Sequence, residues 1–138
     1  MSRLHLRILA LGAACALALT VHAAGQDGFR LTPALLERMQ ALQAEADALT
    51  NSQAGEEVDA QSADELAREL DADPRIRALL ARHRIGSADY AAAVFAILHA
   101  GTYLAMEQTL DRQERNAALA SFTPEQRANI ELLRARRP

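Results

Sequence analysis

The chain contains no tryptophan and no lysine, and only one of its 138 residues is a cysteine. All fifteen basic residues are therefore arginines, a usage that GC-rich bacterial genomes favour. The alternative is selection for guanidinium groups, which bind anions through paired hydrogen bonds. The cysteine, Cys15, lies within an apolar N-terminal run. The rest of the chain has no thiol, which excludes disulfides, cysteine nucleophiles and cysteine-ligated metals there.

Aromatic residues make up 4% of the chain, and β-branched residues are also scarce. No stretch alternates apolar and polar residues as a half-buried strand does, whereas apolar residues recur at a helical spacing of about 3.6. The sequence therefore predicts an all-α protein. Its arginines form no stripe interleaved with aromatic residues, so we expect no nucleic-acid partner.

Residues 1–23 have the parts of a secretory signal peptide. Arg3 and Arg7 precede an uncharged apolar run over residues 8–21, and Val21 and Ala23 suit the −3 and −1 positions of a cleavage site. The run is too short to span a bilayer comfortably. We expect cleavage after Ala23 and a periplasmic or secreted chain without a transmembrane anchor. A lipoprotein signal ending at the cysteine is the alternative, but it would have a very short apolar run.

After the signal peptide, the sequence predicts a flexible N-terminus over residues 24–30 and a single helical domain over residues 31–138. Residues 51–61 interrupt this domain with a polar stretch that contains a glycine and three acidic residues. We predict a mobile acidic loop here. The alternative is a calcium site, but the acidic residues do not follow the spacing of an EF-hand loop.

Helix-start signals recur along the domain and predict a small bundle of about five helices around one central apolar helix. Thr32 and Pro33 suit the N-cap and first position of the first helix. Further starts are expected at Ser62, Asp73 and Thr123, and at the turn over residues 85–87. The apolar residues expected to pack around the central helix include Leu35, Met39, Leu42, Ala46, Leu49, Leu79, Leu80, Ile130 and Leu133.

The central helix is predicted at residues 90–106, a run of seventeen residues without a formally charged side chain. Its apolar side chains point to three sides, so we expect the helix to be buried all round, Leu98 included. Gly101 would then let a neighbouring helix come close. A membrane span is the alternative, but the run is short and rich in alanine. Past Glu107 we expect the same helix to continue as a polar segment to Ser121.

Charge is divided between two halves of the chain. Residues 27–73 carry twelve acidic side chains and three arginines, a balance of −9, whereas residues 74–138 carry six and ten, a balance of +4. We interpret this division as attraction between the halves, within the fold or across a homodimer. A second interpretation is that Arg134, Arg136 and Arg137 form a patch that binds anionic lipid or lipopolysaccharide, an envelope component.

Residues that could carry chemistry are few. Two of the four histidines lie in the signal peptide, and the other two, His83 and His99, lack the spacing and the third ligand of a zinc site. No nucleophile elbow or glycine-rich phosphate loop occurs. We predict no catalytic residue, no cofactor and no metal, with a hydrolase or metal protein as the alternative. His83 is expected to interact with a helix C-terminus.

His99 and Tyr103 lie one helical turn apart in the central helix, and Glu107 follows one turn later. Two interpretations of the His99–Tyr103 pair stay open. Either the pair binds a ligand or handles a proton in a pocket, or His99 is a core histidine whose ring nitrogens find a carbonyl and a hydroxyl as partners.

Short segments of the chain carry two resemblances. Leu31-Thr32-Pro33, Asp89-Tyr90 before an alanine-rich helix, and T-P-E-Q-x-x-N over residues 123–129 resemble uncharacterised exported helical proteins of Gram-negative bacteria, a group that implies no activity. F-T-P-E-Q, over residues 122–126, is also similar to the L-T-x-x-Q signature of periplasmic stress chaperones, with phenylalanine in place of leucine. That resemblance implies a helical cradle that holds client chains, in a chaperone or metal-stress role.

Together these patterns predict an exported, non-enzymatic binding or interaction module. Its partner would be a protein or an envelope component. A periplasmic chaperone of the L-T-x-x-Q type is the alternative function.

Overall fold

In the computed structural model of the chain, residues 28–49 and 60–137 are described. The predicted signal peptide and residues 51–59 of the predicted acidic loop lie outside these ranges. The described ranges form six helices and no strand, which confirms the all-α prediction. The helices are α1 (Pro33–Leu49), α2 (Ala63–Ala72), α3 (Pro74–Arg82), α4 (Ser87–Met106), α5 (Arg112–Ser121) and α6 (Pro124–Ala135).

Local chemistry explains why the helices begin where they do. At four of the predicted starts, a side-chain oxygen accepts a hydrogen bond from a backbone N–H of the first turn, as an N-cap does. These bonds join Thr32 to Leu35 (3.1 Å), Ser62 to Glu65 (3.2 Å), Asp73 to Arg75 (2.8 Å) and Thr123 to Gln126 (3.2 Å). Proline occupies the first helical position of α1, α3 and α6, where its missing N–H has no partner to lose.

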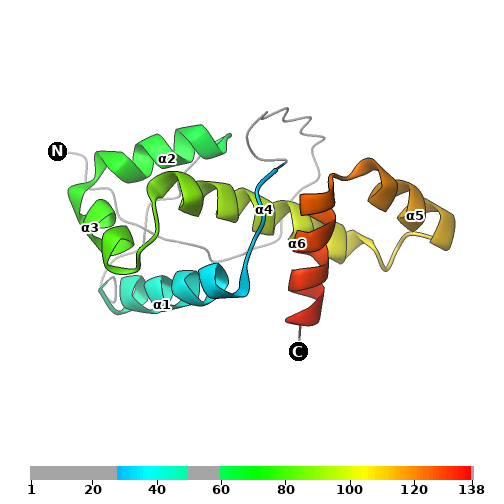
Figure 1. The fold of residues 1–138 in the computed structure, drawn as a ribbon, viewed down its shortest axis with the longest axis horizontal. Coiled ribbons are helices and arrows are strands. Elements are labelled where there is room, and N and C mark those ends of the chain that lie inside the picture. The colour runs from blue at the N-terminus through cyan, green and yellow to red at the C-terminus, as the bar shows by residue number, and fades with distance from the viewer. Residues whose placement is uncertain (1–27, 50–59, 138) are drawn as a thin grey trace.

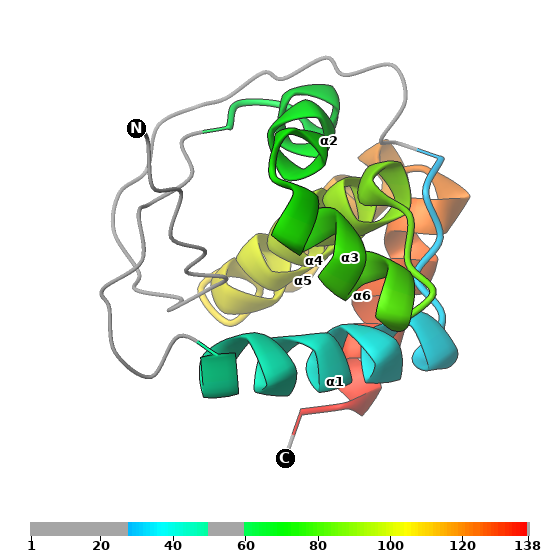
Figure 2. The same ribbon diagram turned by 90° about the vertical axis from the view of Figure 1, so that its left-hand side faces the viewer.

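Helix α4 runs along the length of the molecule and connects two unequal groups of helices (Figure 1). α1, α2 and α3 lie around its N-terminal half, as the end-on view shows (Figure 2). α6 crosses its C-terminal half, and α5 projects beyond the crossing (Figure 1). The most extensive helix contacts are those of α4 with α2 and with α6.

The apolar core is divided in the same way. The first cluster joins α1, α2, α3 and the N-terminal half of α4, with Leu31 and Ile85 from the connecting segments. The second cluster is much smaller and consists of Ala100, Tyr103, Leu104 and Ile130. Partly buried side chains complete the second cluster, and several of them come from the region of α5: Leu110, Ala118, Leu119 and Phe122.

Asn129 ties the segment before α1 to α6. It is 2% exposed and is the one buried polar residue in the described part of the chain. Its Oδ1 accepts a hydrogen bond from the backbone N–H of Leu31, and its Nδ2 donates one to the carbonyl of Phe29, each at 2.8 Å. Residues 28–30, the end of the predicted flexible N-terminus, are therefore held against the domain.

The chain after α4 differs from the single continuous helix that the sequence predicts. α4 ends at Met106, and the turn that follows leads to Asp111, the N-cap of α5. The side chain of Asp111 accepts a hydrogen bond from the N–H of Glu114, whose carboxylate accepts one from the N–H of Asp111, each at 2.8 Å. This capping box starts a new helix, so the described chain has six helices rather than about five.

The prediction that α4 is buried all round is wrong for its C-terminal half. Residues 90–97 are all buried or half-buried, but Leu98 and Met106 are 55% and 52% exposed. A β-carbon added at Gly101 would meet nothing within 4 Å, so no neighbouring helix approaches it. The reason is that α1, α2 and α3 cover only the first half of α4. In α1, Leu49 of the predicted stripe is likewise 70% exposed.

We predict that Asn129→Leu destabilises the fold. The substitution removes two hydrogen bonds and leaves the backbone groups of Phe29 and Leu31 without partners, which should cost about 1–3 kcal/mol. Urea unfolding measures the loss, and Asn116→Leu on exposed α5 is the control. A loss equal to that of the control would show that Asn129 does not hold this segment.

We also predict that Gly101→Ala stabilises the protein. A methyl group at this position meets open space, and alanine is favoured over glycine inside a helix by about 1 kcal/mol. The midpoint of urea unfolding should therefore rise. A lower midpoint would mean that a neighbouring backbone does approach α4 at this point.

Candidate functional site

The C-terminal half of α4 presents an uncharged face to solvent. Its members are spaced i, i+3, i+4, i+7 and i+8, so they share one side of the helix. Four of them are exposed and the glycine is half-exposed. We call this surface the α4 face, and it consists of Leu98, Gly101, Thr102, Ala105 and Met106.

The side-chain hydroxyl of the α4 face already makes a hydrogen bond within the helix. The Thr102 hydroxyl donates a hydrogen bond to the carbonyl of Leu98, one turn earlier, at 2.8 Å. The threonine therefore offers its methyl group more readily than its hydroxyl. The two large side chains, Leu98 and Met106, stand two turns apart with small residues between them. This pattern suits contact with another apolar surface.

His99 and Tyr103 meet at Phe122, which lies between α5 and α6. The rings of His99 and Phe122 are T-shaped, with centroids 4.8 Å apart, and those of Tyr103 and Phe122 are also T-shaped, at 5.5 Å. Both distances are typical of favourable aromatic contacts. We call these three residues the aromatic cluster. The sequence places the first two one turn apart but gives no sign of Phe122 as their partner.

The hydroxyl of Tyr103 is buried and makes no hydrogen bond to any residue in the described ranges. The residue as a whole is 6% exposed. Buried hydroxyls nearly always have a partner, so an exception calls for an explanation. Tyr90, the other tyrosine of α4, lies in the first cluster, where burial raises the pKa of its hydroxyl.

The C-terminal arginines differ in their surroundings. Arg134 binds Glu107 at 2.5 Å and also Glu131, and these hydrogen bonds, that to Glu107 first, raise its pKa. Arg136 and Arg137 are both exposed, and Arg136 lies 3.4 Å from Glu37 of α1. Two of the three guanidinium groups in the predicted anion-binding patch thus already bind carboxylates of this chain.

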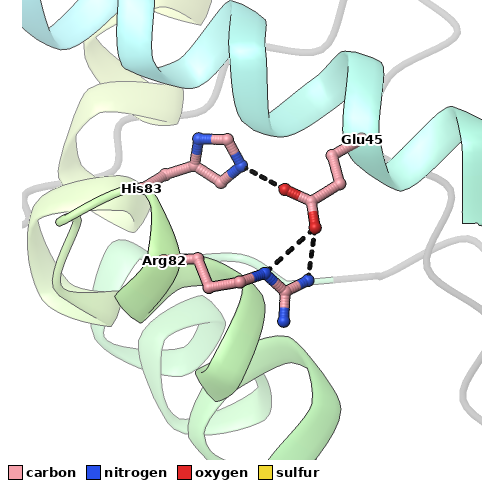
Figure 3. A network of polar contacts seen from close by, with 3 residues as sticks. All are labelled: Glu45, Arg82 and His83. Carbon is pink, nitrogen blue, oxygen red and sulfur yellow. Dashed lines mark hydrogen bonds and ion pairs between the residues drawn. The ribbon is translucent and has the colours of Figure 1, made fainter.

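A second polar network joins α1 to the end of α3 (Figure 3). The carboxylate of Glu45 accepts hydrogen bonds from Nε2 of His83 at 2.6 Å and from Arg82, the nearer nitrogen at 2.5 Å. His83 is also the C-cap of α3, which agrees with the position expected for it. Glu45 was not a candidate from the sequence, since nothing local shows that α1 passes the end of α3.

These contacts stabilise the charged form of Glu45. The hydrogen bond from His83, and next that from Arg82, lower the pKa of Glu45 below its ordinary value. The side chain is about one-third exposed (36%), so water screens the pair and its contribution to stability is modest. The network is a surface contact between helices rather than a catalytic arrangement.

No group of three or more potential metal ligands gathers among the described residues. Within the same ranges, no helix is long and apolar enough to cross a membrane.

No protein-family model matches the chain, and no curated protein or solved structure matches it either. The two resemblances drawn from short segments therefore stay predictions.

We predict that the stabilising effect of Glu45 disappears in acid. Because its pKa is lowered in the folded state, its contribution is present above the pKa of the unfolded chain and is lost as pH falls through the folded pKa. Glu45→Gln should therefore lower the melting temperature at about pH 7 and have little effect at about pH 3.

Glu69→Gln on α2 is the matched control for this measurement. An equal effect of Glu45→Gln at both pH values would contradict the expected ion-pair contribution.

Proposed function

We propose that this chain is an exported, non-enzymatic interaction module that binds a partner protein through the α4 face. The observation that carries the proposal is the exposure of two large apolar side chains, Leu98 and Met106, on an uncharged helix face. Removing apolar surface from water is favourable. Each Å² of apolar surface that a partner covers contributes about 25 cal/mol to the free energy of binding. Export rests on residues 1–23, with cleavage after Ala23 and a periplasmic or secreted location.

The partner that fits this surface best is an apolar helix. The α4 face has the spacing with which helices pack, and its small residues lie between the larger side chains of Leu98 and Met106. The uncharged run offers no counter-charge for an acidic or basic segment. A homodimer is the special case in which two copies of the α4 face pack against each other.

A periplasmic chaperone is the alternative function, and it uses the same surface. Exposed apolar residues also bind unfolded clients, so Leu98 and Met106 favour this candidate too. The residues of the F-T-P-E-Q segment lend it less support. Thr123 and Gln126 bind each other's backbone N–H groups at the start of α6, which accounts for both side chains by helix capping.

We predict that a charge at exposed Leu98 weakens partner binding, whereas a charge at exposed Leu49 does not. Leu98→Asp places a charge on the α4 face, whereas Leu49→Asp places one on a leucine at the end of α1. Affinity purification from the envelope fraction should recover the same partner with the wild type and with Leu49→Asp. Leu98→Asp should weaken recovery about tenfold or more, because burying an unpaired charge in an interface is costly. Both variants should keep melting temperatures near that of the wild type, since both side chains are exposed.

Equal recovery of the partner with Leu98→Asp would overturn the α4 face as the binding surface. Protection of an unfolding client at about stoichiometric ratio, lost in Leu98→Asp alone, would favour the chaperone instead. Self-association lost in the same variant would identify the partner as a second copy. The purified protein should also lack residues 1–23; an intact N-terminus in the cytoplasm would contradict export.

A further inference from the structure

The hydroxyl of Tyr103 is the least explained polar atom of the described structure. It is buried in the second cluster and has no hydrogen-bond partner in the described ranges. A phenol can donate one hydrogen bond and accept others, and burial without any of them costs free energy. The fold needs only the ring at this position, because the ring supplies the contact with Phe122.

The side chains buried around this hydroxyl are apolar, and the polar neighbour in the aromatic cluster is the imidazole of His99, whose ring centroid lies 4.8 Å from that of Phe122. Ala100, Leu104 and Ile130 are buried beside the ring, and Phe122 meets it edge-on. Glu107 lies one helical turn away, but its carboxylate is paired with Arg134 at 2.5 Å. Among the described charged side chains near the cluster, Glu107 and Arg134 pair with each other, and Arg127 of α6 is bound to backbone carbonyls. A charged ligand would lose its hydration here without compensation, whereas a neutral one would not.

The cover over this cluster is thin. α5 has no buried residue, and the side chains that it and its flanking turns contribute are only partly buried: Leu110, Ala118, Leu119 and Phe122. Elements with few buried apolar contacts open at low cost. Capping boxes at Asp111 and Thr123 provide hydrogen-bond partners for backbone N–H groups in the first turns of α5 and α6. α5 can therefore move without losing its own helical hydrogen bonds.

Only Phe122 and Thr123 separate the end of α5 from the start of α6, and the side chain of Arg127 adds hydrogen bonds at this junction. Arg127 donates hydrogen bonds from Nη1 to the carbonyl of Leu119 at 3.1 Å and to that of Phe122 at 2.5 Å. Leu119 is one of the side chains that cover the second cluster, and Phe122 belongs to the aromatic cluster. These exposed bonds hold the cover in place in the structure described here.

We propose that displacement of α5 opens a ligand site at Tyr103, and that this site binds a neutral aromatic molecule carrying a hydrogen-bond acceptor. The aromatic body of the ligand takes the place of Leu110, Ala118 and Leu119 and packs against Ile130 and the ring of Phe122. Its acceptor oxygen receives the hydrogen bond that the Tyr103 hydroxyl lacks. Aromatic ketones and quinones are the matching chemical class. The site is separate from the α4 face and does not depend on the function proposed for that face.

The test uses prodan, a neutral fluorescent naphthyl ketone, with the purified chain. The chain has two tyrosines, both buried and both in α4, so Tyr90→Phe is the matched control for Tyr103→Phe. Wild type and Tyr90→Phe should bind prodan with equal affinity. Tyr103→Phe should bind about tenfold more weakly, because it lacks the one donor aimed at the ligand. Leu98→Asp should bind as the wild type does, which separates this site from the α4 face.

Two further measurements examine how the site opens and what the hydroxyl does. Arg127→Ala removes the two hydrogen bonds at the junction of α5 and α6 and should tighten prodan binding several-fold, because a larger fraction of molecules then has α5 displaced. In Tyr90→Phe, Tyr103 is the only tyrosine and no tryptophan is present, so prodan should quench the remaining tyrosine emission. Without prodan, the Tyr103→Phe variant should have the same melting temperature as the wild type or a higher one.

Several results would overturn the proposal. These are no binding of prodan to the wild type, equal affinity in Tyr103→Phe, or loss of affinity in Leu98→Asp. Unchanged affinity in Arg127→Ala would exclude opening at α5. A marked fall in the melting temperature of Tyr103→Phe would assign the hydroxyl to the stability of the fold.

Discussion

The carboxamide of Asn129 is the contact on which the arrangement of the two ends of the described chain depends. It binds backbone groups of Phe29 and Leu31, almost a hundred positions away, and so holds the start of α1 against α6. Leu31 belongs to the first core cluster, and Ile130, the neighbour of Asn129, belongs to the second. One buried side chain thus joins the two clusters. It also joins two of the three segments that resemble exported helical proteins, L-T-P and T-P-E-Q-x-x-N, because Leu31 belongs to the first and Asn129 to the second.

The division of charge along the sequence has a counterpart in the fold. Glu45 and Glu37 of the acidic half bind Arg82 and Arg136 of the basic half. These pairs are partly exposed, and exposed pairs contribute little net stability. Their effect is to favour one placement of α1 against α3 and α6. Ion pairs between the acidic and the basic half therefore occur within a single chain. Pairing across a homodimer stays a prediction.

Helix starts were predictable because an N-cap is a local event. Thr32, Ser62, Asp73 and Thr123 bond to N–H groups within three residues, and sequence spacing is enough to find them. The same rule applied to Asp111 and Glu114 would have found the start of α5. Burial was predictable only in part. The composition of α4 shows that it can be buried all round, but which side is covered depends on how far α2 and α6 reach along it. The contacts of Glu45 with His83 and of Phe122 with Tyr103 depend on the same long-range placement.

The two proposed sites share one physical cause, which is the small size of the second core cluster. The second cluster has four buried residues, and α5 contributes none of them. The cluster is therefore too small to bury all the apolar surface of the C-terminal half of α4. One side of that half is left as the α4 face, and the other side encloses a hydroxyl without a partner. Neither a polar residue at position 98 nor phenylalanine at position 103 would remove a contact described here. The Leu98 side chain and the Tyr103 hydroxyl are therefore the two groups in this half of α4 to which the proposed binding sites assign a role.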